Sequence, residues 1–318
     1  MSERVARPEG VPPGGLLAIG ETMAMVAPMA AEPVESAEEF RVDAGGAESN
    51  VAAHVAALGV DAAWCSRVGD DALGRRVVSR IAGRGVDVSR VIVDAVHPTG
   101  LYVKDPGNGV SYYRAGSAAS HLDPADADAL SWDGVAVLHV SGITAALTGT
   151  APAFLSRVVE RARAAGVLVS VDVNHRAALW SAADAAGPLL ELARRADLVF
   201  VGRDEAETLW GTETAADARA LLHDVPQLVV KDGAVGATLF DGDESVFEPA
   251  LLVDVVEPVG AGDAFAGGYL AAMLAGADPS ERLRTGHTRA ALTMGTTGDF
   301  PEAPATASVH PSSERTPA

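Results

Sequence analysis

A short stretch of the sequence, VDVVEPVGAGDAFAGG at residues 253–268, combines a flexible turn with a carboxylate. An apolar, strand-like run ends in Glu-Pro, and two glycines then precede Asp263, where a helix is expected to begin. Because glycines let backbone N–H groups converge and a helix N-terminus is partly positive, Gly260, Ala261 and Gly262 could form an anion hole. Asp263 is then either a helix N-cap or a general base that accepts a hydroxyl proton beside a transferring phosphoryl group.

The sequence lacks the motifs of several other nucleotide-dependent enzymes. It contains no G-x-x-x-x-G-K-[ST] phosphate loop and no G-x-G-x-x-G fingerprint after a strand, which disfavours Walker-type ATPases and Rossmann dehydrogenases. The eight histidines are scattered, and His54 and His139 lie in apolar segments that favour a structural role. Cys65 is the only cysteine, so an intrachain disulfide is impossible, and its apolar surroundings indicate a small core residue.

Composition limits the partners that the chain can have. A net charge of -19 over 318 residues argues against nucleic acid and acidic membrane surfaces, which require a basic stripe. The opening residues lack the apolar core of a signal peptide, and no apolar run is long enough to span a membrane. We therefore expect a cytoplasmic protein with small-molecule ligands.

Strand patterns alternate with helix patterns along most of the chain. This alternation predicts an α/β fold with a mostly parallel sheet and helices on both faces, and ligands in such folds bind beyond the carboxyl ends of the strands. Residues 236–242 and 244–256 look more antiparallel. The predicted strands are 16–20, 62–69, 134–142, 167–174, 197–202 and 227–233, and the predicted helices include 49–59, 71–85, 182–195, 262–275 and 279–295.

Two segments, at about 21–46 and 99–116, do not follow this alternation of strands and helices. They contain short strands with turn residues, and the DPGNG stretch at 105–109 is a hairpin signal. Such insertions could form a small sheet that acts as a lid or as a contact in a homo-oligomer. The ends, 1–14 and 306–318, are rich in small and turn-forming residues and are expected to be flexible tails.

Two motifs together resemble one enzyme family. VEPVGAGDAFAGGYLAAML and GGAESNVAAHVAALG (45–59) resemble the two signatures of the ribokinase-like (PfkB) carbohydrate kinases, in the right order and spacing. The resemblance implies one kinase domain over 15–305, with the three-layer ribokinase-like fold and a small β-sheet lid. It also assigns the residues of both motifs: Asp263 as catalytic base, Gly260, Ala261 and Gly262 as anion hole, and Gly45, Gly46 and Asn50 as sugar-binding residues.

Further segments are similar to one branch of that family, the 2-keto-3-deoxygluconate kinases. These segments are SYYRAGSAAS (111–120), LHVSGIT (138–144), VDVNHRAALW (171–180) and GDFPEAP (298–304). A sugar acid carries a carboxylate, which the planar guanidinium of arginine binds with two hydrogen bonds; the alternative for each arginine is a surface salt bridge. By resemblance, the residues around the substrate include Tyr102, Tyr113, Arg114, Ile143, Arg176 and Asp299.

The resemblance also implies ATP and Mg²⁺ as cofactors. VVKDGAVGATLF (229–240) is similar to the segment that approaches ATP, which makes Lys231, Gly233 and Gly236 candidates, together with Asn174 near the phosphates. Lys231 could equally be a surface charge at a strand end. Glu205 matches the last position of the family's N-x-x-E element and would act on Mg²⁺ indirectly, although Gly202 replaces the Asn. Glu257 replaces an Asp before the glycine turn, which leaves a monovalent cation uncertain.

The resulting hypothesis is ATP-dependent phosphorylation of 2-keto-3-deoxygluconate at its 6-hydroxyl. The nearest alternative is a kinase of a neutral sugar, such as a fructokinase or ribokinase. A catalytically silent sugar-binding protein is a further alternative, although binding alone needs no base.

Overall fold

The computed structural model describes residues 11–30, 32–296, 298, 300 and 301. An eight-stranded sheet, here called the large sheet, runs through the molecule in the order β14-β13-β12-β11-β10-β9-β1-β4. The pairs from β4 to β12 are parallel, and β13 and β14 are added antiparallel. Its strands are β1 (Gly15–Ile19), β4 (Ala62–Cys65), β9 (Val135–Ser141), β10 (Leu168–Asp172), β11 (Leu198–Gly202), β12 (Gln227–Asp232), β13 (Gly236–Asp241) and β14 (Glu244–Pro249).

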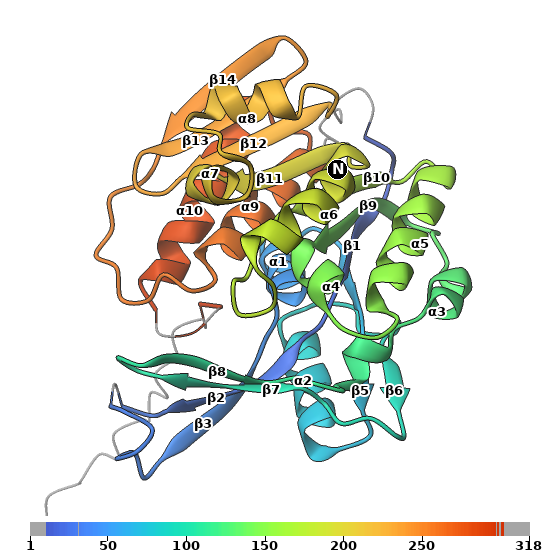
Figure 1. Cartoon of the computed structure of the whole chain (residues 1–318), viewed down its shortest axis with the longest axis vertical. Coiled ribbons are helices and arrows are strands. Elements are labelled where there is room, and N and C mark those ends of the chain that lie inside the picture. The colour runs from blue at the N-terminus through green and yellow to red at the C-terminus, as the bar shows by residue number, and fades with distance from the viewer. Residues whose placement is uncertain (1–10, 31, 297, 299, 302–318) are drawn as a thin grey trace, which may run out of the picture.

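Helices cover both faces of the large sheet (Figure 1). Buried side chains of α1 (Ala47–Ala57), α2 (Ala72–Gly83), α9 (Ala261–Leu274) and α10 (Pro279–Met294) join one hydrophobic cluster. Side chains of α3 (Pro124–Ala129), α5 (Ala151–Ala164), α6 (Ala182–Arg194), α7 (Arg203–Trp210) and α8 (Ala215–Leu221) join the other. The short helices η1 (Ala118–His121) and α4 (Gly142–Ala146) complete the set within the described residues. This three-layer arrangement is the one that the family resemblance implied.

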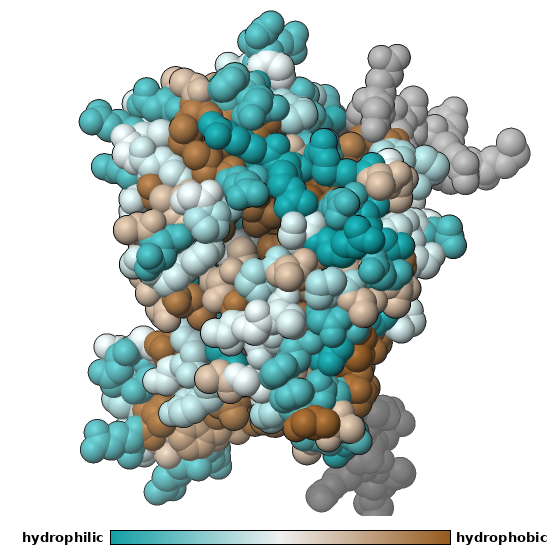
Figure 2. Space-filling view, turned by 45° about the vertical axis from the view of Figure 1, so that its right-hand side comes forward, coloured by the Kyte–Doolittle hydropathy of each residue, from teal (hydrophilic) through white to brown (hydrophobic). Residues whose placement is uncertain are grey.

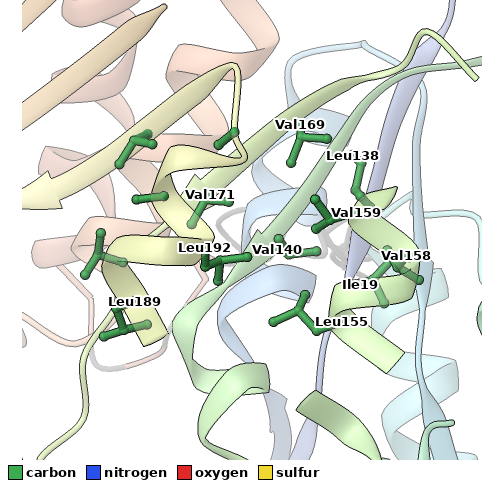
Figure 3. Packing of buried hydrophobic residues seen from close by; sticks show 14 of the residues in the cluster. Ile19, Leu138, Val140, Leu155, Val158, Val159, Val169, Val171, Leu189 and Leu192 are labelled. Atoms are coloured by element: carbon green, nitrogen blue, oxygen red, sulfur yellow. The ribbon is translucent and has the colours of Figure 1, made fainter. Parts of the chain in front are cut away.

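The two clusters follow from the alternation of side chains along each strand. In β1, Leu17 and Ile19 belong to one cluster and Leu16 and Ala18 to the other, as a period of two residues requires. Figure 3 shows the cluster under α5 and α6, where Leu155 and Leu192 of the helices approach strand residues such as Ile19, Val140 and Val171. A sheet buried on both faces explains why its strands read as nearly continuous apolar runs.

The two interrupting segments form a separate four-stranded sheet, here called the small sheet. Its order is β3-β2-β7-β8, and the strands are β2 (Met23–Pro28), β3 (Phe40–Gly45), β7 (Leu101–Asp105) and β8 (Gly109–Tyr113). The small sheet stands apart from the main body in Figure 1, at the bottom of the view. A further pair consists of β5 (Arg67–Gly69) and β6 (Ile92–Asp94).

Two strand predictions were wrong in detail. The predicted strand at 244–256 ends at Pro249, and residues 250–256 form no strand; Leu252 there is 97% exposed, so the apolar run has no sheet to pack on. The predicted strand at 62–69 is divided between β4 and β5, because β4 joins the large sheet whereas β5 pairs with β6. Of the predicted tails, 1–14 and 306–318, all but residues 11–14 lie outside the described residues. Within the described part of the chain, no helix has the length and apolarity to cross a membrane.

Candidate active site

A cavity of about 710 Å³ lies where the carboxyl ends of the large sheet meet the small sheet. Figure 2 shows a notch at the left edge, between the larger upper part of the molecule and the lower part. One side of the cavity is formed by residues at or just after the ends of β1, β9, β10, β11 and β12: Glu21, Ile143, Asp172, Asn174, Gly202 and Lys231. The other side is formed by small-sheet strands β7 and β8 and by the residue that follows β8: Tyr102, Lys104, Tyr112 and Arg114.

The glycine turn before α9 opens into this cavity. Gly260 is the N-cap of α9 with φ of +85°, a conformation that L side chains rarely adopt. At Gly262 an added Cβ would meet only the Nζ of Lys231 within 4 Å, at 3.6 Å, so the glycine leaves room between the helix N-terminus and the lysine. Because the first amides of a helix lack intrahelical partners, this gap is suited to an anion.

Asp263 lies in the first turn of α9 and is 9% exposed. Its Oδ2 accepts a hydrogen bond of 3.0 Å from Nδ2 of Asn50, in the first turns of α1. The other side-chain atom of Asn50, Oδ1, is buried and accepts no hydrogen bond from the described residues. A hydroxyl group of a ligand in the cavity would satisfy it. The two sequence motifs therefore meet at one point, with a carboxylate and an unused acceptor side by side.

A partly buried ion pair lies close to the N-terminus of α9. Lys231 Nζ donates to Asp172 Oδ2 at 2.9 Å, and Asp172 is only 3% exposed. Burial acts to lower the pKa of Lys231, but the carboxylates of Asp172, Glu205 and Asp263 outweigh it and raise that pKa overall. The lysine therefore keeps its positive charge at neutral pH.

Glu205 has a structural task that the sequence did not reveal. Its carboxylate accepts the backbone N–H groups of Gly202, at 3.1 Å, and of His175, so it closes the N-terminus of α7 and fixes the loop after β10. Burial raises its pKa, with a further contribution from Asp172. Both carboxylate oxygens already accept hydrogen bonds from backbone N–H groups. This arrangement is compatible with an indirect effect of Glu205 on a metal ion rather than with direct ligation.

The cavity has acidic and basic groups suited to a magnesium nucleotide. The described residues contain no group of three or more His, Cys, Asp or Glu side chains placed to hold a metal ion. Mg²⁺ in kinases is held largely through phosphate oxygens and one or two carboxylates, and Asp172 and Asp204 line the cavity. The gap at Gly262 and the charge of Lys231 fit the phosphates themselves.

The two predicted arginines differ in their surroundings. Arg176 lines the cavity and is exposed, and its guanidinium group makes no hydrogen bond or ion pair with the described residues. Arg114 also lines the cavity, but its Nε donates to Glu21 Oε2 at 2.7 Å and its Nη2 donates to the same oxygen. The positive charge of Arg114 is thus already matched by a buried carboxylate.

Most predicted site residues meet in the cavity, and a few do not. Gly45, Gly46, Asn50, Tyr102, Ile143 and Asn174 line it. Asn174 has φ of +43°, uncommon outside glycine, which orients this residue beyond the end of β10. Ala261 contributes through its backbone, between the lining residues Gly260 and Gly262. Asp299 lies outside the described residues.

The other predicted residues lie away from the cavity lining. Gly233 and Gly236 flank the turn between β12 and β13. Tyr113 is 62% exposed and does not line the cavity, whereas its neighbour Tyr112 does. Tyr112 pairs with Tyr102 across β7 and β8, with ring centroids 5.9 Å apart, so the two rings share the cavity face.

Glu21, Asp172 and Tyr112 are among the lining residues that the sequence analysis did not assign to the site. Glu21 and Asp172 each stand at the carboxyl end of a predicted strand, which is where ligand-binding residues of parallel sheets collect. That position was the available signal. Tyr112 could have been found only from the strand register, because a shift of one residue exchanges the two faces.

Comparisons with known proteins show the family to which the chain belongs. Residues 15–305 match the family model described as pfkB family carbohydrate kinase. A 2-dehydro-3-deoxygluconokinase of Thermoproteus tenax is 35% identical over 301 residues, 89% of each chain. A 2-dehydro-3-deoxygalactonokinase of Haloferax volcanii is 32% identical and covers 90% of this chain and 92% of its own. The crystal structure of a 2-dehydro-3-deoxygluconokinase from Thermotoga maritima, 25% identical, matches with a TM-score of 0.81 over 90% of this chain and 94% of that one.

Proposed function

The chain belongs to the pfkB family of carbohydrate kinases, which transfer a phosphoryl group from ATP to an alcohol, and we propose that its acceptor is the 6-hydroxyl of 2-keto-3-deoxygluconate, also named 2-dehydro-3-deoxygluconate. The product is 2-keto-3-deoxy-6-phosphogluconate. The observation that carries the proposal is the meeting of three groups in one cavity: the Asp263 carboxylate, the N-terminus of α9 and the unpaired Arg176.

Asp263 is the general base. It faces the cavity from the first turn of α9, and Asn50 holds one of its oxygens. The second oxygen accepts the proton of the attacking hydroxyl, which makes that hydroxyl a better nucleophile. Oδ1 of Asn50 accepts a hydrogen bond from the sugar and thereby orients it.

The glycine turn and Lys231 stabilise the transferring group. When bound, MgATP supplies the γ-phosphoryl group, and the metal ion offsets part of its charge. The amides at residues 261 and 262 and the helix dipole of α9 favour the negative charge that develops in the transition state. Lys231 is held beside them by Asp172, so its ammonium group needs little reorganisation.

Arg176 binds the acid end of the substrate. It is exposed to the cavity and is not matched by a carboxylate among the described residues, so an incoming carboxylate gains its full attraction. The small sheet then acts as a lid that excludes water from the reacting groups, with Tyr102 and Tyr112 against the ligand. Since the reaction consumes ATP, we expect it to take place in the cytoplasm.

An acceptor panel tests the proposal. Purified protein is given ATP, Mg²⁺ and, one at a time, 2-keto-3-deoxygluconate, 2-keto-3-deoxygalactonate, fructose, ribose or adenosine. Turnover confined to the keto-deoxy acids supports the proposal. Preferential turnover of fructose or ribose would leave the fold and the base in place and reject the sugar-acid assignment. ATP binding without turnover of any acceptor would favour the silent sugar-binding protein.

A further inference from the structure

Glu21 lies where the large sheet passes into the small sheet. It follows β1 and Gly20, is separated from the first residue of β2 by one position, and is 3% exposed. No resemblance or sequence pattern assigned it a role. A buried carboxylate at such a connection needs hydrogen-bond donors, because an unpaired buried charge is strongly destabilising.

Those donors come from the end of the small sheet. Arg114, directly after β8, donates from Nε to Glu21 Oε2 at 2.7 Å and from Nη2 to the same atom. The Ser117 hydroxyl donates to Glu21 Oε1 at 2.5 Å. Gly100, directly before β7, leaves the necessary space, since a Cβ there would lie 2.9 Å from Glu21 Oε1.

This arrangement fixes the guanidinium group of Arg114 before any ligand binds. The Arg114 side chain is only 11% exposed, and the carboxylate holds two of its three nitrogens. The third, Nη1, makes no hydrogen bond with the described residues, and Arg114 lines the cavity. An arginine held in this way offers Nη1 to a ligand without having to be immobilised first.

We propose that Glu21 is the positioning residue of Arg114: it fixes the guanidinium group for the bound sugar acid and compensates its charge, so that Arg176 provides the uncompensated positive charge of the acid-binding site. The proposal rests on the sugar-acid function. Glu21 acts on the ligand only through Arg114. Removal of the Glu21 carboxylate therefore weakens binding of the sugar acid by about tenfold, which is the order of magnitude of the entropic cost of immobilising one long side chain.

The test is a double-mutant cycle of Glu21→Gln, Arg114→Ala and the double variant. Affinity for 2-keto-3-deoxygluconate is measured by isothermal titration calorimetry without ATP, so the result does not depend on turnover. We expect Glu21→Gln to weaken binding about tenfold in the wild-type background and by less than about twofold in the Arg114→Ala background, because the two act as one unit. ATP affinity should not change in any variant.

A matched control separates positioning from general destabilisation. Asp94 is also a buried carboxylate, bound to Arg67 at 3.2 Å, but neither residue lines the cavity. Asp94→Asn should lower Tm and leave the affinity for the sugar acid unchanged. If Glu21→Gln does not fold, Glu21→Asp, which keeps the charge but is one methylene shorter, replaces it in the cycle with the same expectation.

The possible outcomes are distinct. A Glu21 variant that binds the acid as tightly as the wild type, or one that weakens binding further when Arg114 is already alanine, overturns the positioning role alone. Wild-type protein that binds no keto-deoxy acid overturns the sugar-acid function and, with it, the positioning role.

Discussion

Asn50 Nδ2 lies 3.0 Å from Asp263 Oδ2, although 213 positions separate the two residues in the chain. Close packing of α1 on α9 makes this contact possible. At Gly267 of α9, an added Cβ would lie 2.5 Å from Cβ of His54 in α1, so glycine is needed there for the two helices to approach. The glycines of the VEPVGAGDAFAGGYLAAML motif thus serve two purposes: Gly260 and Gly262 shape the helix N-terminus, and Gly267 lets α1 bring Asn50 close to Asp263.

Arg176→Ala should impair use of the sugar acid. Loss of a charged hydrogen-bonding partner costs between about tenfold and a hundredfold in affinity, so KM for 2-keto-3-deoxygluconate should rise by that factor while KM for ATP stays constant. Steady-state kinetics measure both. Arg75→Ala is the matched control, because Arg75 is a surface arginine whose side chain is 67% exposed. An unchanged KM for the acid in Arg176→Ala would contradict its role.

Gly262→Ala should separate phosphate binding from folding. The new methyl group would lie 3.6 Å from Lys231 Nζ, an ordinary contact, so Tm should not fall. The methyl group nevertheless occupies the space between the helix N-terminus and Lys231, and kcat/KM for ATP should drop by about tenfold or more.

Gly83→Ala is the control for this substitution. Gly83 ends α2, does not line the cavity, and nothing lies within 4 Å of its added Cβ. Its kinetics should equal those of the wild type. Kinetics of Gly262→Ala that also match the wild type would show that the phosphates do not bind in this gap.

Glu48 should make stability depend on pH. It is fully buried in the first turn of α1, where it accepts hydrogen bonds from Ser141, at 2.6 Å, and Thr144, at 3.3 Å, while its Oε2 has no partner among the described residues. Burial raises its pKa, and the two hydroxyl groups oppose the shift only in part. Because the folded-state pKa is above the ordinary value of about 4.3, its stability contribution is present below that value and is lost as pH rises through the folded-state pKa.

Glu48→Gln removes this titration while keeping the shape of the side chain. The free energy of unfolding of the variant minus that of the wild type should therefore increase as the pH rises above about 4.3, as measured by urea denaturation over a range of pH. A difference that stays constant over this range would mean that Glu48 does not titrate there.

Much of the fold could be predicted because the large sheet is buried on both faces. Runs such as residues 135–141 are largely apolar and end in turn or polar residues, which marks both the strand and its carboxyl edge. The wrong prediction at 250–256 also came from an apolar run. Such a run forms a strand only if the fold places another strand beside it. Helices α7 and α8 are short and carry little apolar pattern, and they were not predicted.

The site was predictable where a motif fixes the backbone, as at Gly260 and Asn50. Roles that depend on a distant partner could not be predicted. From the sequence, Arg114 was expected to bind the carboxylate of the substrate. Its positive charge is in fact paired with the carboxylate of Glu21, 93 positions earlier. The choice between Tyr112 and Tyr113 depends on the register of β8. The homo-oligomer expected through the small sheet stays a prediction.

The most direct measurement compares the wild type and Asp263→Asn in ATP-dependent phosphorylation of 2-keto-3-deoxygluconate. Loss of a general base should lower kcat by about 10²- to 10⁴-fold. KM for the acid and for ATP should change little, since the asparagine amide has nearly the shape of the carboxylate that it replaces. We predict formation of the 6-phosphate by the wild type and almost none by the variant. A variant that turns over the acid at a rate close to that of the wild type would show that Asp263 is not the base.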